Sequence, residues 1–301
     1  MESIYKELIK TIGKDRVLIN EPMSKHTSFR IGGPADLFIK INNVDELNCV
    51  LKVAKKNNIA VTCIGNGSNT LVKDKGIRGI TIKLNFTDIN VIGDIIEVGS
   101  GVAIPVLAKV AYDNSLTGLE FASGIPGTIG GAIAMNAGAY GGEFGNIVVS
   151  TKYMDENLEV HTITKEEQEF SYRHSFFSTG KNIIISTIIK LEKGNKEEIK
   201  EKMQDDASRR KEKQPLNFPS AGSVFRNPEG AAAWKYIDDA GLRGYEIGGA
   251  QVSPKHSNFI VNNGYASAKD IHDLIFYVQK TVQEKYGVLL KPEVRFINWE
   301  S

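Results

Sequence analysis

A glycine-rich run at residues 123–142, SGIPGTIGGAIAMNAGAYGG, constrains this chain more than any other segment. It contains seven glycines and one proline, and it lacks Asp, Glu, Lys and Arg. Glycine has no Cβ atom to keep a ligand away from backbone N–H groups, and it allows the positive φ of tight turns. Such a segment can surround a polyphosphate with amide dipoles without a lysine. A tightly packed core loop would explain the same composition.

A second glycine-rich loop, GNGSNT at residues 65–70, directly follows the apolar run at residues 59–64. Two small-residue loops that each follow strand-like sequence suggest one extended nucleotide cofactor held from two sides. Neither loop is a G-x-G-x-x-G that opens a helix after a strand, and no G-x-x-x-x-G-K-[ST] occurs. A Rossmann domain and a P-loop fold are therefore disfavoured.

Composition narrows the possible partners and metals. The chain has 37 basic and 36 acidic residues, so no strong overall field attracts nucleic acid or an anionic membrane. Its five histidines show no metal-ligand spacing, and no metal site is predicted. Cys49 and Cys63 form no C-x-x-C pair, and Cys63 is expected in the core. Without a signal peptide or an apolar stretch of about 18 residues, a cytoplasmic protein with no membrane partner is expected.

Hydrophobic periodicity and capping residues predict the main helices and strands. Asn43 is expected to cap a helix, and Ser267 with Asp270 is expected to cap another. Predicted helices cover residues 4–12, 104–114, 195–214 and 267–286. Predicted strands include residues 77–84, 89–98, 147–154, 183–192 and 291–299.

Three short polar segments interrupt apolar sequence: YRHSFF (172–177), SAGSVFRNP (220–228) and KPEVRF (291–296). In the third, the alternation of a strand places Glu293 and Arg295 on one face. Taken singly, each of these residues is more simply explained as a surface or structural residue. A Ser-His-Asp hydrolase is disfavoured because no G-x-S-x-G elbow is present.

Taken together, these segments resemble one family, the bacterial flavoenzyme UDP-N-acetylenolpyruvoylglucosamine reductase. The resemblance is carried by FRIGGPAD, GNGSNTLV, the glycine-rich run, YRHS, AGSVFRNP, IGGAQVSPKHSNFIVN and KPEVRFI, which follow the family order. It implies an α+β fold, with a two-lobed FAD-binding domain of the vanillyl-alcohol-oxidase/PCMH type and a C-terminal α+β substrate-binding domain. The implied boundaries are 1–86 and 87–200 for the FAD lobes, 201–290 for the substrate domain, and 291–301 for a C-terminal strand with the catalytic glutamate.

The resemblance also implies roles for individual residues. Ser223 matches the family's proton donor, and Arg173 and Glu293 match its charge-stabilising residues. Substrate contacts are implied at Tyr172, Asn227 and Arg295. FAD contacts are implied at Ile64, Gly65, Asn66, Gly67, Ser68, Asn69, Thr70, Ser123, Gly124, Pro126, Gly127, Gly130, Gly131, Asn136, Ala137 and Gly138. The short spacing between Arg173 and Ser223 resembles the compact, type II-like variant, which lacks a long inserted loop.

The implied reaction uses NADPH to reduce FAD. Flavin N5 then gives hydride to the vinyl carbon of UDP-N-acetylenolpyruvoylglucosamine, and Ser223 protonates the neighbouring carbon. The FAD is expected to be non-covalent because neither glycine-rich loop contains His or Cys. The protein is expected to be a monomer that makes UDP-N-acetylmuramate for peptidoglycan. Alternatives are another FAD-dependent oxidoreductase or oxidase of the same fold, and a non-catalytic nucleotide-binding regulator of the cell wall.

Overall fold

The computed structural model, which describes residues 1–299, has an α+β architecture of three larger β-sheets with helices packed against them. The chain forms two compact units, each made from separate segments. Unit 1 contains Met1–Ile19, Leu37–Gly65 and Gly79–Arg210, and unit 2 contains Asn20–Asp36, Asn66–Arg78 and Lys211–Ser301. These units are built from separate segments, whereas the expected FAD lobes and substrate domain are continuous stretches ending at residues 86, 200 and 290. The expected boundaries describe ligand-binding lobes and stay a prediction. Residues 300 and 301, at the end of the last predicted segment, lie outside the described residues.

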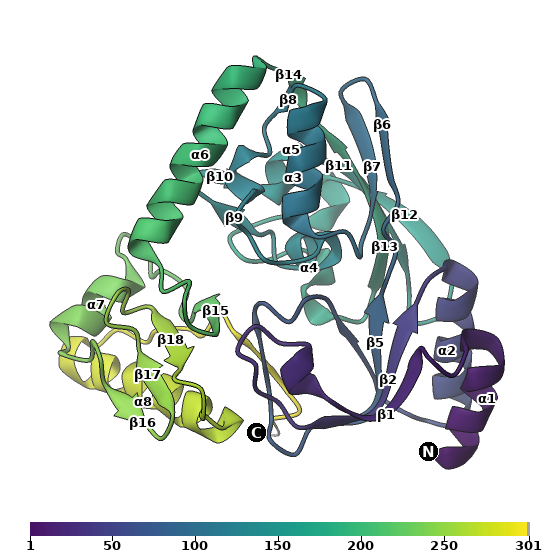
Figure 1. Cartoon of the computed structure of the whole chain (residues 1–301), viewed down its shortest axis with the longest axis horizontal. Coiled ribbons are helices and arrows are strands. Elements are labelled where there is room, and N and C mark those ends of the chain that lie inside the picture. The colour runs from purple at the N-terminus through teal and green to yellow at the C-terminus, as the bar shows by residue number, and fades with distance from the viewer. Residues whose placement is uncertain (300–301) are drawn as a thin grey trace. The chain divides into compact units, whose positions relative to one another are not determined.

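The first sheet has the strand order β1-β2-β5-β3. Its strands are β1 (Val17–Pro22), β2 (Pro34–Ile41), β5 (Ile77–Leu84) and β3 (Val61–Ile64). Helices α1 (Glu2–Ile12) and α2 (Val44–Lys56) lie side by side in Figure 1, and their apolar faces share one core with the sheet. As predicted, the side chain of Asn43 caps α2, accepting a hydrogen bond from Glu46 N at 2.9 Å. The prediction for Cys63 was wrong, because β3 is an edge strand and the cysteine is exposed.

The second sheet lies in unit 1, is antiparallel throughout and has the order β12-β11-β13-β7-β6. Its strands are β6 (Ile89–Ile92), β7 (Ile95–Gly99), β11 (Val148–Met154), β12 (Val160–Thr164) and β13 (Ile183–Lys190). Helices α3 (Ile104–Asp113) and α4 (Ile129–Ala134) contribute to the core of this sheet. The single strand expected at 89–98 is instead a hairpin, because Gly93 adopts φ +67° and reverses the chain.

Shorter elements complete this region. They are β8 (Leu116–Thr117), β9 (Gly138–Ala139), β10 (Gly142–Glu143), α5 (Phe144–Ile147), β14 (Glu192–Lys193) and the long helix α6 (Lys196–Lys213). The strands pair as β9 with β10 and as β8 with β14. Asn195 Oδ1 accepts hydrogen bonds from Glu197 N at 2.9 Å and Glu198 N at 3.3 Å at the start of α6.

Unit 2 contains a four-stranded sheet of order β15-β18-β17-β16. Its elements are β15 (Ser220–Ser223), α7 (Ala233–Asp239), β16 (Glu246–Ile247), β17 (Ala250–Val252), β18 (Phe259–Asn262) and α8 (Ala268–Tyr286). The predicted capping box of Ser267 and Asp270 is present at the start of α8. A separate parallel pair joins β4 (Thr70–Val72) to β19 (Arg295–Ile297).

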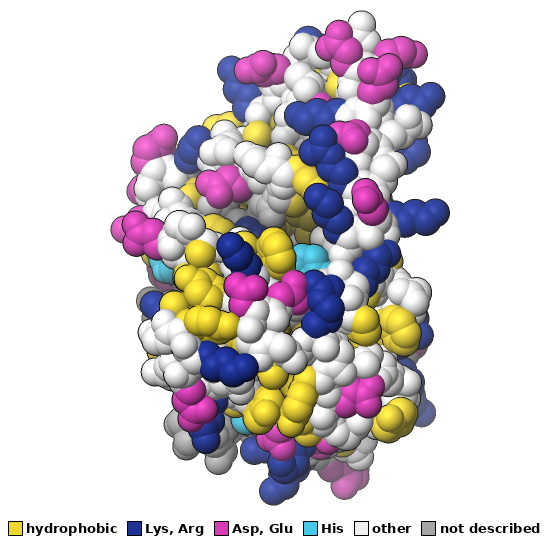
Figure 2. All heavy atoms as spheres, turned by 90° about the vertical axis from the view of Figure 1, so that its left-hand side faces the viewer, with side chains coloured by type: hydrophobic (Ala, Val, Ile, Leu, Met, Phe, Trp, Pro, Cys, Tyr) yellow, Lys and Arg dark blue, Asp and Glu magenta, His cyan; other side chains and the backbone are white. Residues whose placement is uncertain are grey.

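The strand expected over residues 291–299 is shorter than predicted. Only Arg295–Ile297 forms a strand, because residues 291–293 hydrogen-bond instead to the segment around Phe225. On the face drawn in Figure 2, Lys and Arg side chains are interspersed with Asp and Glu side chains. No helix within residues 1–299 combines the length and the apolar composition that crossing a bilayer requires.

Candidate active site

The two glycine-rich segments meet in unit 1. Within residues 123–142 the chain forms α4, and Thr128 Oγ1 caps this helix by accepting a hydrogen bond from Gly131 N at 3.4 Å. A Cβ atom on Gly65 would lie only 2.5 Å from Thr128 Oγ1. Any residue other than glycine at position 65 would therefore disturb the start of α4.

The YRHS segment is tied to the glycine-rich run within the same unit. Asn136 is fully buried, accepts a hydrogen bond from Gly145 N at 2.8 Å, and donates one to Ser171 O at 3.0 Å. The guanidinium of Arg173 donates a hydrogen bond to Gly138 O at 3.3 Å. The structure thus brings Arg173 to a segment whose residues are predicted to contact FAD. It also gives Asn136 a structural role that the sequence did not indicate.

Arg173 has an unusual backbone conformation, with φ +56°. This left-handed region is sterically unfavourable for a residue with a Cβ atom. The guanidinium carbon lies 5.1 Å from the centroid of the Tyr172 ring, within the range of a cation–π interaction. Strained residues of this kind are concentrated at functional sites, so the conformation supports a functional hypothesis for Arg173.

From Asn66 onward, the GNGSNT loop belongs to unit 2, and its backbone at Gly67 packs closely against the backbone of residues 26–28. Gly67 has φ +60°, and a Cβ atom there would lie 2.2 Å from His26 O. Gly67 O accepts a hydrogen bond from Ser28 N at 3.1 Å. The loop therefore packs backbone against backbone on the segment that precedes FRIGGPAD, and glycine is required at position 67.

Ser223 and Glu293 lie on neighbouring segments of unit 2. Glu293 N donates a hydrogen bond to Val224 O at 2.7 Å, and Arg226 N donates one to Lys291 O at 2.9 Å. Gly222 adopts φ +75°, and the pairing of β15 with β18 is irregular between Ser220 and Ser223. Such irregularities re-aim side chains next to active sites. The structure therefore unites two residues that are 70 positions apart in sequence.

Asn258 supports the segment that carries Ser223. Its side chain accepts a hydrogen bond from Phe225 N at 3.0 Å and donates one to Phe225 O at 2.9 Å. Its own carbonyl oxygen accepts a hydrogen bond from Val224 N at 2.8 Å. Asn258 is buried, so these bonds are protected from water.

Two arginines give this part of unit 2 a positive character. Partial burial and the nearby guanidinium of Arg226 both lower the pKa of Arg295 below its ordinary value. Arg226 Nε is buried and has no hydrogen-bond partner among residues 1–299. An anionic group bound here would offset the repulsion between the two guanidinium groups.

Several supporting contacts could not be identified from the sequence. Asn227, a predicted substrate contact, also accepts a hydrogen bond from Ala233 N at 3.0 Å at the start of α7. Thr128, Arg226 and Asn258 were not singled out, although each lies within a segment that carries the family resemblance. Arg226 and Asn258 bond to residues distant in sequence, and Thr128, besides capping α4 locally, lies against Gly65, so only the folded chain reveals these long-range contacts.

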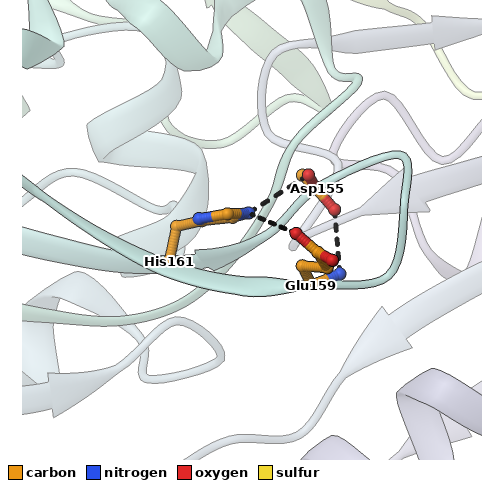
Figure 3. Close-up of side chains that lie close together, drawn as sticks. All are labelled: Asp155, Glu159 and His161. Carbon is orange, nitrogen blue, oxygen red and sulfur yellow. Dashed lines mark hydrogen bonds and ion pairs between the residues drawn. The ribbon is translucent and has the colours of Figure 1, made fainter.

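Within the described part of the chain, one group of side chains could in principle hold a metal ion. His161 Nε2 lies 3.1 Å from Asp155 Oδ2 and 3.9 Å from Glu159 Oε2 (Figure 3). Asp155 Oδ1 also accepts hydrogen bonds from Glu159 N and Asn157 N, and the bond from Glu159 contributes most to lowering the pKa of Asp155. The turn between β11 and β12 explains the position of all three side chains, and no metal is proposed.

Two family profiles match different parts of the chain. The family profile described as "UDP-N-acetylenolpyruvoylglucosamine reductase, C-terminal domain" matches residues 214–297. The profile described as "FAD binding domain" matches residues 35–164. The predicted combination of an FAD-binding domain with a C-terminal domain of this family is therefore confirmed.

Relatives match over almost the full length. The UDP-N-acetylenolpyruvoylglucosamine reductase of Caldanaerobacter subterraneus subsp. tengcongensis is 48% identical over 99% of both chains, and that of Clostridioides difficile is 47% identical over 98% of both. The crystal structure of the reductase from Thermus caldophilus superposes with a TM-score of 0.81 at 34% identity, covering 94% of this chain and 99% of that one. The grass pollen allergen Phl p 4, with glucose dehydrogenase activity, superposes at 0.51 and 14% identity, covering 64% and 44%. This last likeness concerns the fold alone.

Proposed function

The chain belongs to the UDP-N-acetylenolpyruvoylglucosamine reductase family, and on that basis we propose that it reduces the enolpyruvyl group of UDP-N-acetylenolpyruvoylglucosamine to the lactyl ether of UDP-N-acetylmuramate. The structural observation that carries this proposal is the hydrogen bond from Glu293 N to Val224 O. It holds the residue proposed to stabilise charge beside the segment of the proposed proton donor, Ser223.

FAD is the proposed cofactor, bound without a covalent link. Gly65 and Gly67 lie in the loop proposed to contact FAD, and a Cβ atom at either position would collide with neighbouring protein atoms, so the path of this loop requires glycine at both. The proposed FAD lobes are residues 1–86 and 87–200, and the substrate domain is 201–290. When bound, FAD supplies the hydride that it has accepted from NADPH.

Three side chains are proposed to act on the substrate. Ser223 donates a proton to the carbon next to the ether oxygen, and such general acid catalysis contributes about 10²–10⁴-fold. Arg173 stabilises the negative charge that develops on that carbon and its carboxylate. Glu293, in its protonated form, donates a hydrogen bond to the same group. Aimed donors of this kind are worth about 10²–10³-fold each.

Tyr172, Asn227 and Arg295 are the proposed additional substrate contacts. For Arg295, the support is electrostatic: an anionic part of the substrate would offset its repulsion with Arg226. The proposed enzyme is a monomer of the compact, type II-like variant. Because NADPH and UDP-linked sugars are cytoplasmic metabolites, the proposal places the enzyme in the cytoplasm and in peptidoglycan synthesis.

The decisive experiment separates the two half-reactions in the absence of oxygen. NADPH is expected to bleach the flavin absorbance of the purified protein. Adding UDP-N-acetylenolpyruvoylglucosamine should then restore the colour rapidly. In Ser223→Ala, bleaching by NADPH should persist while the return of colour is slowed by about 10²-fold or more.

Other outcomes would lead to different conclusions. Rapid reoxidation by oxygen with no response to NADPH would favour an oxidase of the same fold. Bleaching without reoxidation by the UDP-sugar would leave a flavin reductase with another acceptor. A protein without flavin would contradict the proposal, and flavin that stays on the polypeptide after denaturation in acid would contradict non-covalent binding.

A further inference from the structure

Both the side chain and the main chain of Asn69 bond to the segment that carries Glu293. Asn69 Nδ2 donates a hydrogen bond to Glu293 O at 3.0 Å, and Asn69 O accepts one from Arg295 N at 3.0 Å. Directly beyond, β4 and β19 pair with Arg295 opposite Thr70. The N–H of Glu293 is held by Val224 O. The main chain of Glu293 is therefore fixed on one side by the segment of Ser223 and on the other by Asn69.

Of these two bonds, the one to Glu293 O depends on the side chain of Asn69. The bond from Arg295 N uses the carbonyl oxygen of Asn69, so it survives any substitution. The bond to Glu293 O needs a donor of the length of asparagine. An aspartate at position 69 would present two acceptors to this carbonyl, and an alanine would leave it without its donor.

We infer that Asn69 is a positioning residue that holds Glu293 in place for reduction of the substrate, in addition to its place in the GNGSNT loop. This inference rests on the proposed function of Glu293. It also means that ordering of the GNGSNT loop is transmitted directly to the segment that carries the glutamate, just before β19. No cofactor contact of Asn69 is needed for this effect.

A double-mutant cycle on the flavin-loaded enzyme tests the inference. Asn69→Ala is expected to slow reoxidation of the flavin by UDP-N-acetylenolpyruvoylglucosamine by about 10-fold, the usual effect of one hydrogen bond. Reduction by NADPH should slow less than reoxidation does, since loss of an FAD contact of Asn69 affects both half-reactions whereas the bond to Glu293 O acts only on the second. In a Glu293→Ala background the second substitution should add almost nothing, because no carboxyl group remains to be positioned.

Asn298→Gly is the matched control. Asn298 Nδ2 donates a hydrogen bond to Gly76 O at 2.9 Å, which ties the same C-terminal segment to residues 66–78 at a point beyond Glu293. Asn298 has φ +62°, and glycine tolerates this conformation. Both half-reactions should stay near the wild-type rates. The inference fails if Asn69→Ala slows both half-reactions equally, or if its effect is the same with and without the Glu293 carboxyl group.

Amide hydrogen exchange of the full-length, FAD-free protein tests the inference independently of activity. Asn69→Ala should speed exchange at the amides of Glu293 and Arg295, whereas Asn298→Gly should leave both unchanged. Unchanged exchange in Asn69→Ala would overturn the inference, even if that variant binds no FAD. Failure of the wild-type enzyme to be reoxidised by the UDP-sugar would refute the proposed function instead. The exchange measurement would still decide whether Asn69 fixes the main chain at Glu293 and Arg295.

Discussion

At Arg173, backbone energy and proposed chemistry favour different residues. Its φ of +56° is more easily adopted by glycine, and yet the position carries a guanidinium that bonds to Gly138 O. Gly65 and Gly67 show the opposite situation, because there the lack of a side chain is the requirement. At Gly65 and Gly67 neighbouring protein atoms exclude a side chain, whereas at Arg173 the proposed chemistry requires one.

Replacing Arg173 should separate activity from stability. Arg173→Gly and Arg173→Ala both remove the guanidinium, so both should slow reoxidation of the reduced flavin by the UDP-sugar by about 10²–10³-fold. The glycine variant should be more stable than the alanine variant by about 1 kcal/mol, because alanine keeps the steric cost of positive φ. Urea unfolding of the two variants measures this difference. An alanine variant of equal or greater stability would contradict the explanation from backbone strain.

Helix α8 is stabilised by caps at both of its ends. Its sequence predicted the capping box of Ser267 with Asp270, and Gly287 ends the helix with φ +71°. The structure adds Asp74, whose carboxylate accepts hydrogen bonds from Ala268 N at 2.8 Å and Lys269 N at 3.0 Å. A negative charge at this end also interacts favourably with the helix dipole.

Removing the carboxylate of Asp74 should therefore destabilise the protein. Asp74→Ala is expected to lower the free energy of unfolding by about 1–2 kcal/mol, from the loss of two capping bonds and a favourable charge. Asp273→Ala on the same helix removes the exposed ion pair with Lys269 and should cost less than about 0.5 kcal/mol. Chemical denaturation at pH 7 compares the two variants. Equal losses would show that Asp74 does not act as a helix cap.

For the whole molecule, the most consequential feature is that unit 2 is assembled from three separate segments. Its core combines Phe29, Ile31 and Leu71 with residues of α7, α8 and the sheet of β15 to β18. Phe29, Ile31 and Leu71 are fully or almost fully buried. The C-terminal segment alone would therefore expose apolar surface that these residues cover in the full chain.

A fragment of residues 211–301 is accordingly expected not to fold on its own. Without residues 20–36 and 66–78 it loses the strand partner of β19 and the three buried side chains. Circular dichroism and amide NMR of the fragment should show no cooperative thermal unfolding and little chemical-shift dispersion. A cooperative transition would show that residues 211–301 are sufficient to form the core, even though the matched family profile covers most of them.

Local patterns were enough to predict a large part of the fold. The caps at Asn43 and Ser267 and the helices at α3 and α6 were predicted correctly, because capping and helical periodicity act between residues close in sequence. The hairpin at Gly93 was missed even though its signal is local. The strand expected over residues 291–299 was predicted too long for a different reason, since residues 291–293 pair with a segment far away in sequence.

Sequence patterns alone were sufficient to predict the capped helices and to find the resemblance that pointed to Ser223, Arg173 and Glu293. The folded chain was needed to show that Glu293 is held between Val224 and Asn69, that Asn258 supports the Ser223 segment, and that Thr128 lies against Gly65. Each of these contacts joins segments separated by tens of residues or more. Propensities and motifs reflect interactions between residues close in sequence. Strand pairing and backbone packing instead depend on which distant segments the folded chain brings together.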